Sequence, residues 1–181
     1  MFRPKFSKML RALYTTMLVA SLGVLTGCYS FTGSSLSKEI QTIYIKDFLN
    51  TASYVNPMLA QQFSTDIQNR FLQRTTLKGT KENPDISIEG EITNYQVSPT
   101  TISSPVNAAG GVIQAAQNKL SITVKVHYEN KVDTEKSFDR TYTDEVAFSS
   151  SMDINTIETT QVKIVNERII NKIFNDIVAD W

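Results

Sequence analysis

The sequence predicts an α+β domain in which two helices pack on a four-stranded mixed, largely antiparallel sheet, in the order β-α-β-β-β-α. Two segments carry wide apolar stripes at helical spacing, and such stripes need another layer of structure to cover them. The last three strand-like segments follow one another without a helix between them, and a short turn joins the final two. This arrangement is typical of an antiparallel meander.

Four segments have the residue pattern of strands. Residues 40–48 are β-branched and aromatic with apolar residues on both faces, which predicts a strand covered on both sides or nearly so. Residues 86–93 alternate apolar and polar side chains, and the alternation shifts past Thr93, so we expect a β-bulge or bend near Asn94. Residues 120–128 and 138–148 complete the predicted sheet.

The first helix follows a predicted turn at residues 50–55. Asn56 is a favourable cap, and Pro57 suits the first helical position because its missing N–H has no helical partner there. Apolar residues then recur every fourth position, at Leu59, Phe63, Ile67 and Phe71, and Ala60 and Leu72 widen this stripe. Gly79 and Pro84 mark the loop by which the chain leaves this helix.

The second helix closes the chain and ends at Trp181. Asn155 and Glu158 are spaced as a variant of the capping box, so we expect the helix to begin there. Its apolar stripe is wide enough to be core, and comprises Val162, Val165, Ile169, Ile173 and Ile177, with Ile170, Phe174 and Val178 beside it.

Residues 98–118 are predicted to form a long loop rich in Ser, Thr, Pro, Ala and Gly, with no charged residue. Loops beyond about 12–15 residues are uncommon in compact domains and usually functional or disordered. We interpret this loop as the partner interface, with Val106, Val112 and Ile113 as candidate contact residues. A solvated loop without function is the alternative.

The N-terminal segment has the pattern of a bacterial lipoprotein signal peptide. Four cations and no anion precede an uncharged stretch that runs from Ala12 to Gly27. The segment Leu25-Thr26-Gly27-Cys28 resembles a lipobox, and a lone cysteine in an exported chain cannot form an internal disulfide. The alternative is a buried structural cysteine after an ordinary cleavage site. We therefore predict a cleaved peptide at 1–27, a lipidated tether at 28–37 and one domain at 38–181.

Lipidation of Cys28 also predicts where the protein lies. A diacylglycerol together with an amide-linked chain such as palmitate gives stable anchoring, which a single acyl chain does not. Tyr29 follows the cysteine, whereas lipoproteins retained at the inner membrane typically have Asp there. We expect a lipid-anchored protein on the periplasmic face of the outer membrane.

Composition excludes several classes of function. Removing residues 1–27 leaves 14 Lys and Arg against 18 Asp and Glu, a net charge of −4, so nucleic acid is an unsuitable partner. The chain has one Cys and one His, which argues against zinc and haem centres. We expect no metal and no cofactor beyond the covalent lipid.

The sequence contains no convincing catalytic site. His127 lies on the polar face of a predicted strand, where a solvated side chain is more common than a general base. Glu89 and Glu91 point to one side of their strand, but nothing nearby suggests the burial that would separate their pKa values. No nucleophile elbow or zinc-protease motif is present. We expect the protein not to be an enzyme.

The lipobox, residues 29–35, the strand around Ile43 and the segment 55–57 resemble lipopolysaccharide-assembly lipoproteins of LptE type in their Bacteroidetes form. Residues 88–95, 120–126 and 173–181 are similar as well, so the resemblance covers essentially the whole mature chain. Its motifs are structural, apart from the lipobox, and so identify a family and not a site.

The resemblance implies two helices on a four-stranded mixed sheet and a protein that plugs and helps assemble the outer-membrane β-barrel translocon of LptD type. It also implies assistance in delivering lipopolysaccharide to the outer leaflet. In this family basic residues contact lipopolysaccharide. Lys119 and Lys125 are candidates for this contact, because Lys125 lies on the polar face of its predicted strand and Lys119 lies where the long loop enters that strand. The alternatives are an accessory lipoprotein of another envelope machine, such as a secretin pilotin or a barrel-assembly component, and a lipoprotein hydrolase.

Overall fold

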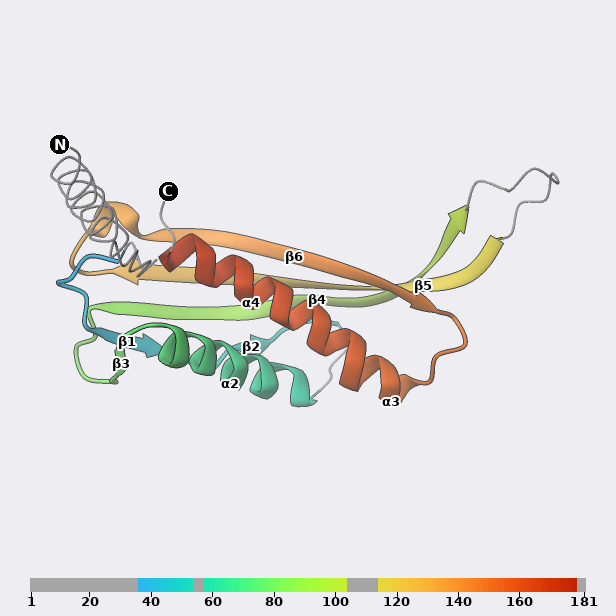
Figure 1. Cartoon of the computed structure of the whole chain (residues 1–181), viewed down its shortest axis with the longest axis horizontal. Coiled ribbons are helices and arrows are strands. Elements are labelled where there is room, and N and C mark those ends of the chain that lie inside the picture. Colours follow the sequence, from blue (N-terminus) through green and yellow to red (C-terminus); the bar gives the residue numbers. More distant parts are fainter. Residues whose placement is uncertain (1–35, 54–56, 104–113, 179–181) are drawn as a thin grey trace, which may run out of the picture. The chain divides into compact units, whose positions relative to one another are not determined.

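Two helices cover one face of a mixed sheet in the computed structural model (Figure 1), which confirms the predicted α+β class. The structure describes residues 36–53, 57–103 and 114–178. Several predictions lie outside the described residues: the signal peptide at 1–27, the lipid-bearing Cys28, the cap at Asn56, the loop residues Val106, Val112 and Ile113, and the helix end at Trp181.

The sheet has six strands where the sequence predicted four. They are β1 (Thr42–Ile45), β2 (Leu49–Asn50), β3 (Lys78–Gly79), β4 (Ile86–Ser103), β5 (Gln114–Asn130) and β6 (Phe138–Ser149). The spatial order is β3-β1-β4-β5-β6, and β2 also pairs with β4. Pairings that involve β1, β2 and β3 are parallel, whereas β4, β5 and β6 form an antiparallel meander.

The two additional strands are two residues long and leave no hydropathy pattern. β2 occupies the start of the predicted turn at 50–55, where Thr51 N–H donates to the carbonyl of Ile92 at 2.9 Å. β3 lies in the predicted exit loop, where Lys78 N–H donates to the carbonyl of Gln41 at 2.9 Å. The expectation that the first strand is covered on both faces is wrong, because only alternate residues of β1 are buried.

Helix α2 (Pro57–Arg74) and helix α4 (Val162–Val178) form the covering layer. A short α3 (Ile154–Thr156) and one π-helical turn, η3 (Ile157–Gln161), lead directly into α4. The predicted cap at Asn155 is wrong by two residues. Asp153 caps the helix instead, because its carboxylate accepts a hydrogen bond from Thr156 N–H at 3.0 Å.

The core lies between the sheet and the two helices. Both predicted helical stripes are buried there, except that Ala60 and Phe174 are half-buried and Leu72 is 47% exposed. The inward-facing residues of β4 and β5 meet these stripes, and the most deeply buried are Ile86, Ile88, Ile92, Leu120, Ile122 and Val124. The short connection from β5 to β6 contains one 3₁₀ turn, η2 (Thr134–Lys136).

The β4–β5 hairpin corrects the predicted loop at 98–118. The register shifts between Ile92 and Asn94, which confirms the predicted bulge, and pairing then continues to Ser103 opposite Gln114. Residues 98–103 and 114–118 are therefore strand and not loop. These residues do not alternate apolar and polar side chains, so the sequence contains no strand pattern there.

Candidate functional site

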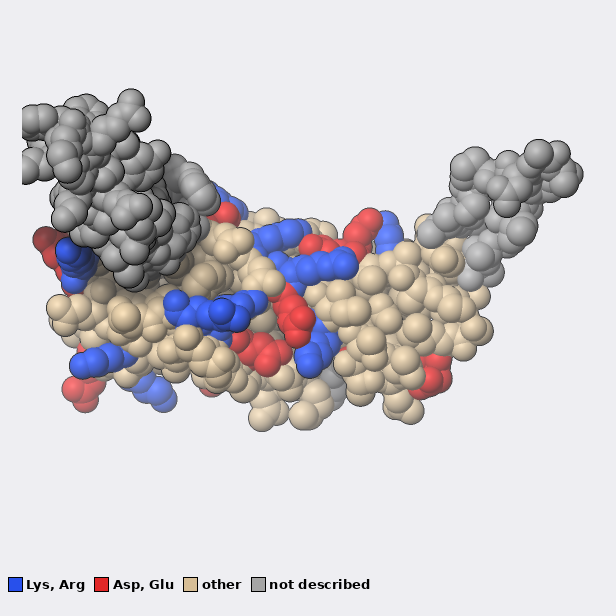
Figure 2. All heavy atoms as spheres, viewed as in Figure 1, with Lys and Arg blue, Asp and Glu red and all other residues tan. Residues whose placement is uncertain are grey.

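The end of the sheet that bears the β4–β5 hairpin is almost free of charge. Residues 92–118 and 146–152 contain no Asp, Glu, Lys or Arg. The pairing of Gln117 with Ser149 brings these two segments to the same end of the sheet, at the right of Figure 1. Figure 2 shows this end as a nearly continuous surface without charged side chains. We call it the uncharged end.

Large apolar side chains are exposed at the uncharged end. Val97 in β4 is 41% exposed, and Ile154 at the start of α3 is 53% exposed. Apolar side chains gathered on an exposed surface mark interaction sites. The largest cost of docking a polar surface is the burial of an unpaired charge away from water. This surface has no charged side chain, so a partner could cover it without that cost.

The chain enters the domain at the opposite end of the sheet. Leu36, Ser37 and Ile40 line a hollow together with Tyr128, which is near the end of β5, whereas the hairpin lies at the beginning of β5. The described start of the domain and the uncharged end are therefore separated by the length of β5. At about 3.3 Å per residue this is roughly 50 Å.

The polar residues singled out in the sequence lie together on the helix-free face of the sheet, in ion pairs. Lys125 Nζ is 4.0 Å from Glu91 Oε1, and Lys119 Nζ is 2.8 Å from Glu145 Oε2. Glu89 pairs with Lys46 at 3.1 Å, and His127 Nδ1 is 2.9 Å from Asp139 Oδ1.

Most of these side chains border an open hollow of about 530 Å³ that Gly90 and Val126 also line. Glu89 and Glu91 each face a cation and do not form a carboxylate pair, and the side chains of Glu89 and His127 are about half exposed. The geometry of an acid–base pair with separated pKa values is not found here. The pairing also neutralises the local charge of Lys119 and Lys125.

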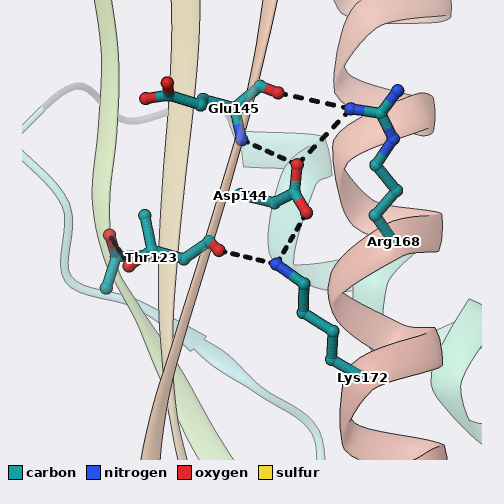
Figure 3. Close-up of polar contacts among 6 residues, drawn as sticks. Thr123, Asp144, Glu145, Arg168 and Lys172 are labelled. Carbon is teal, nitrogen blue, oxygen red and sulfur yellow. Dashed lines mark hydrogen bonds and ion pairs between the residues drawn. The ribbon is translucent and has the colours of Figure 1, made fainter.

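A polar cluster that sequence reasoning missed joins β6 to α4 (Figure 3). Asp144 points inward from β6, and its side chain is 13% exposed. Its carboxylate lies 2.7 Å from Lys172 Nζ and 3.5 Å from Arg168 Nη1. Lys172 also donates to the Thr143 carbonyl at 3.0 Å, and Arg168 to the Glu145 carbonyl at 3.3 Å.

This cluster keeps Asp144 ionised. Partial burial raises the pKa of Asp144, but the hydrogen bonds from Lys172 and from the backbone of Glu145 outweigh burial, so the pKa lies below its ordinary value. A charged residue at an inward position of an otherwise alternating strand was the available signal. It could not show which helix supplies the cations.

A second contact between the same elements lies one helical turn further on. Asp176 of α4 accepts hydrogen bonds from Arg140 Nη1 at 2.5 Å and from Tyr142 Oη at 2.8 Å, both in β6. Burial raises the pKa of the Tyr142 hydroxyl, and the neighbouring Asp176 carboxylate adds to the shift. Both clusters hold α4 against the edge strand β6.

Within residues 36–53, 57–103 and 114–178, no three His, Cys, Asp or Glu side chains are grouped in a way that could hold a metal ion. None of the helices in the described part of the chain is both long enough and apolar enough to cross a membrane.

Comparison with known families gives the identity. The family model described as LptE, lipopolysaccharide-assembly, matches residues 40–181, which is the whole domain. The chain belongs to the LptE family. Membership links this LptE-family protein to lipopolysaccharide assembly in general and to the cell envelope, in a family of accessory proteins that are not enzymes.

Three solved structures with a related arrangement are distant from this chain in sequence. A minor lipoprotein from Acinetobacter baumannii is 13% identical with a TM-score of 0.48, over 78% of this chain and 95% of that chain. Lipoprotein GNA1162 from Neisseria meningitidis is 11% identical with a TM-score of 0.41, over 75% and 99%. The rare lipoprotein B from Shewanella oneidensis is 9% identical with a TM-score of 0.33, over 74% and 89%. No curated protein matches the sequence.

Proposed function

We propose that this LptE-family protein is an outer-membrane lipoprotein, acylated at Cys28, that plugs and helps assemble a β-barrel lipopolysaccharide translocon of LptD type and assists delivery of lipopolysaccharide to the outer leaflet. The observation that carries the proposal is the family match over residues 40–181. The lipobox-like segment ending at Cys28 supports the anchor and the periplasmic face of the outer membrane.

The barrel contacts the uncharged end, together with the loop residues Val106, Val112 and Ile113. The absence of charge from residues 92–118 supports this assignment, because small uncharged side chains can approach a barrel wall closely without stranding an ion. The exposed Val97 and Ile154 add apolar area to the same surface.

Site-specific photo-crosslinking in cells tests this assignment. Crosslinkers at Val106, Val112 and Ile113 should trap the barrel, whereas a crosslinker at Gln62, an exposed position of α2, should trap it less. Equal yields at all four positions would show that the uncharged end is not the contact.

Deletion of residues 100–117 is a second test of whether this surface contacts the barrel. It removes the outer arms of β4 and β5 as well as the loop between them, so barrel binding should be lost. If barrel assembly and partner binding both survive the deletion, the hairpin is a spacer and the assignment is wrong.

A further inference from the structure

The main-chain groups of an edge strand can pair with a strand of another chain, and β6 is a long edge strand. It spans Phe138–Ser149, and within the described residues it pairs with β5 and with no other strand. At about 3.4 Å per residue, its outer side carries roughly 40 Å of main-chain donors and acceptors. Proteins that remain monomeric block such an edge.

The cluster of Asp144, Arg168 and Lys172 occupies main-chain groups in the middle of this edge. Lys172 Nζ donates to the Thr143 carbonyl at 3.0 Å, and Arg168 Nη1 donates to the Glu145 carbonyl at 3.3 Å. The Glu145 N–H donates to the Asp144 carboxylate at 2.8 Å. The main-chain groups of alternate residues point to the same side of a strand, so those of Thr143 and Glu145 both point away from β5. These are the groups to which an added strand would bond.

The same side chains also fill the space that an added strand would need. Figure 3 shows Arg168 and Lys172 reaching from α4 to the edge of β6. Asp144 places a charge at an inward-facing position of this strand, where its side chain is 13% exposed. Inward-pointing charges are one of the features by which natural edge strands avoid pairing. An added strand would have to displace both cations and would leave the Asp144 carboxylate half-buried without its partners, which is costly.

The opposite edge of the sheet is blocked in a similar way by α2. The edge strand β3 is two residues long, and a very short edge strand is itself protected from pairing. Beyond β3, Gln68 Nε2 donates to the Ile45 carbonyl at 3.2 Å, and the Phe48 N–H donates to Ser64 Oγ at 2.8 Å. Each helix therefore sends polar side chains to main-chain groups at the sheet edge beside it.

We propose that the Asp144–Arg168–Lys172 cluster keeps this protein from self-associating, because it blocks the edge of β6 against strand addition by a second copy of the chain. The β6 strands of two copies could pair in antiparallel orientation about a twofold axis, which makes such an interface self-complementary. The cluster lies in the middle of the strand, so only the short stretches Phe138–Tyr142 and Val146–Ser149 remain on either side. This role is independent of any barrel partner.

Removing the cluster tests the proposal. The variant D144T/R168A/K172A, called the opened variant, replaces the three side chains together and so leaves no unpaired charge against the core. The mature lipoprotein would be purified in detergent with micelles in excess, and light scattering would give the mass of protein in each particle. The parent should be monomeric, whereas the opened variant should form dimers or larger species, with a dissociation constant lower by about tenfold or more.

The matched control R140A/D176A removes an ion pair between the same two elements. The contact between Arg140 and Asp176 joins side chains only, so its loss frees no main-chain group of β6. This control should remain monomeric. Equal self-association of the two variants would overturn the proposal, because loosening of α4 alone would then explain it. A monomeric opened variant with the circular dichroism spectrum of the parent would also overturn it. If the opened variant does not fold, K172A keeps the pair of Asp144 and Arg168 and should still self-associate more than the control.

Proline at position 143 shows whether the association uses main-chain hydrogen bonds. The Thr143 N–H points away from β5, as its carbonyl does, so T143P keeps the pairing of β5 with β6 and removes a donor from the outer edge. Added to the opened variant, T143P should restore the monomer. Dimers that persist with T143P would refute strand addition, because the copies would then be joined through side chains.

Discussion

Replacing Ile173 with Ala tests whether the closing helix is core. Ile173 lies in the middle of α4, its side chain is 0% exposed, and it belongs to the stripe that packs on β5 and β6. The substitution removes three carbon atoms, and at about 0.8 kcal/mol for each buried group the lost transfer energy is about 2.4 kcal/mol.

The cavity that remains adds to this cost. If the surrounding structure does not relax, a cavity of about 70 Å³ at about 24 cal/mol per Å³ contributes roughly 1.7 kcal/mol, and full collapse contributes nothing. I173A should therefore lower the free energy of unfolding by about 2.5–4 kcal/mol, within the usual range of about 2–5 kcal/mol for a buried aliphatic side chain.

Urea denaturation followed by circular dichroism measures this change. The control E167A, an exposed position of the same helix, should stay within about 0.5 kcal/mol of the parent. A loss below about 1 kcal/mol for I173A would refute the reasoning, because the stripe would then be exposed in solution and available as an interface.

Three further predictions concern other parts of the molecule. G90A should lower the melting temperature, because an added Cβ would lie 2.5 Å from Phe48 Cε1 and 2.3 Å from the Lys125 carbonyl oxygen; an unchanged melting temperature would contradict the packing. Folding lowers the pKa of Asp144, so its ionised form stabilises the folded state above about pH 4 and this contribution is lost as the pH falls through the lowered folded-state pKa. The difference in unfolding free energy between the parent and D144N should therefore be largest near neutral pH and shrink toward about pH 2, and a difference that does not vary with pH would refute the ion pairs. Mass spectrometry of the membrane-extracted protein should find an acylated Cys28 and C28S should be released in soluble form, whereas an unmodified Cys28 in the native protein would rule out the anchor.

Sequence patterns predicted the elements that are long and half-buried. Each of these elements buries one face. That burial produces the apolar stripes of α2 and α4 and the alternation of β4 and β5, and both patterns are visible in the sequence. The bulge near Asn94 was visible for the same reason, because a residue inserted in a strand moves all later side chains to the other face.

The errors arose where backbone pairing needs no apolar face. β2 and β3 are each two residues long, too short to show a hydropathy period. The outer arms of the β4–β5 hairpin are paired although their residues do not alternate apolar and polar side chains. The helix start was misplaced because Asp153 and Asn155 are both suitable caps and only geometry shows which one accepts the hydrogen bond from Thr156.

The candidate sites depended on contacts between distant segments. The sequence indicated that Lys119 and Lys125 lie near the polar strand face, but it could not show that Glu145 and Glu91 neutralise them. The cluster of Asp144, Arg168 and Lys172 joins a strand to a helix, and a helical stripe contains no information about which strand its polar face adjoins.

Partner identity in the outer membrane is the most direct test of the central claim. The lipoprotein would be affinity-tagged, crosslinked in intact cells and recovered from outer membranes, and the captured proteins would be identified by mass spectrometry. The account predicts that the large β-barrel lipopolysaccharide translocon of LptD type is the principal partner and that a strain depleted of the lipoprotein contains less assembled barrel. Capture of a secretin or of a barrel-assembly component in its place, with translocon levels unaffected by the depletion, would contradict it.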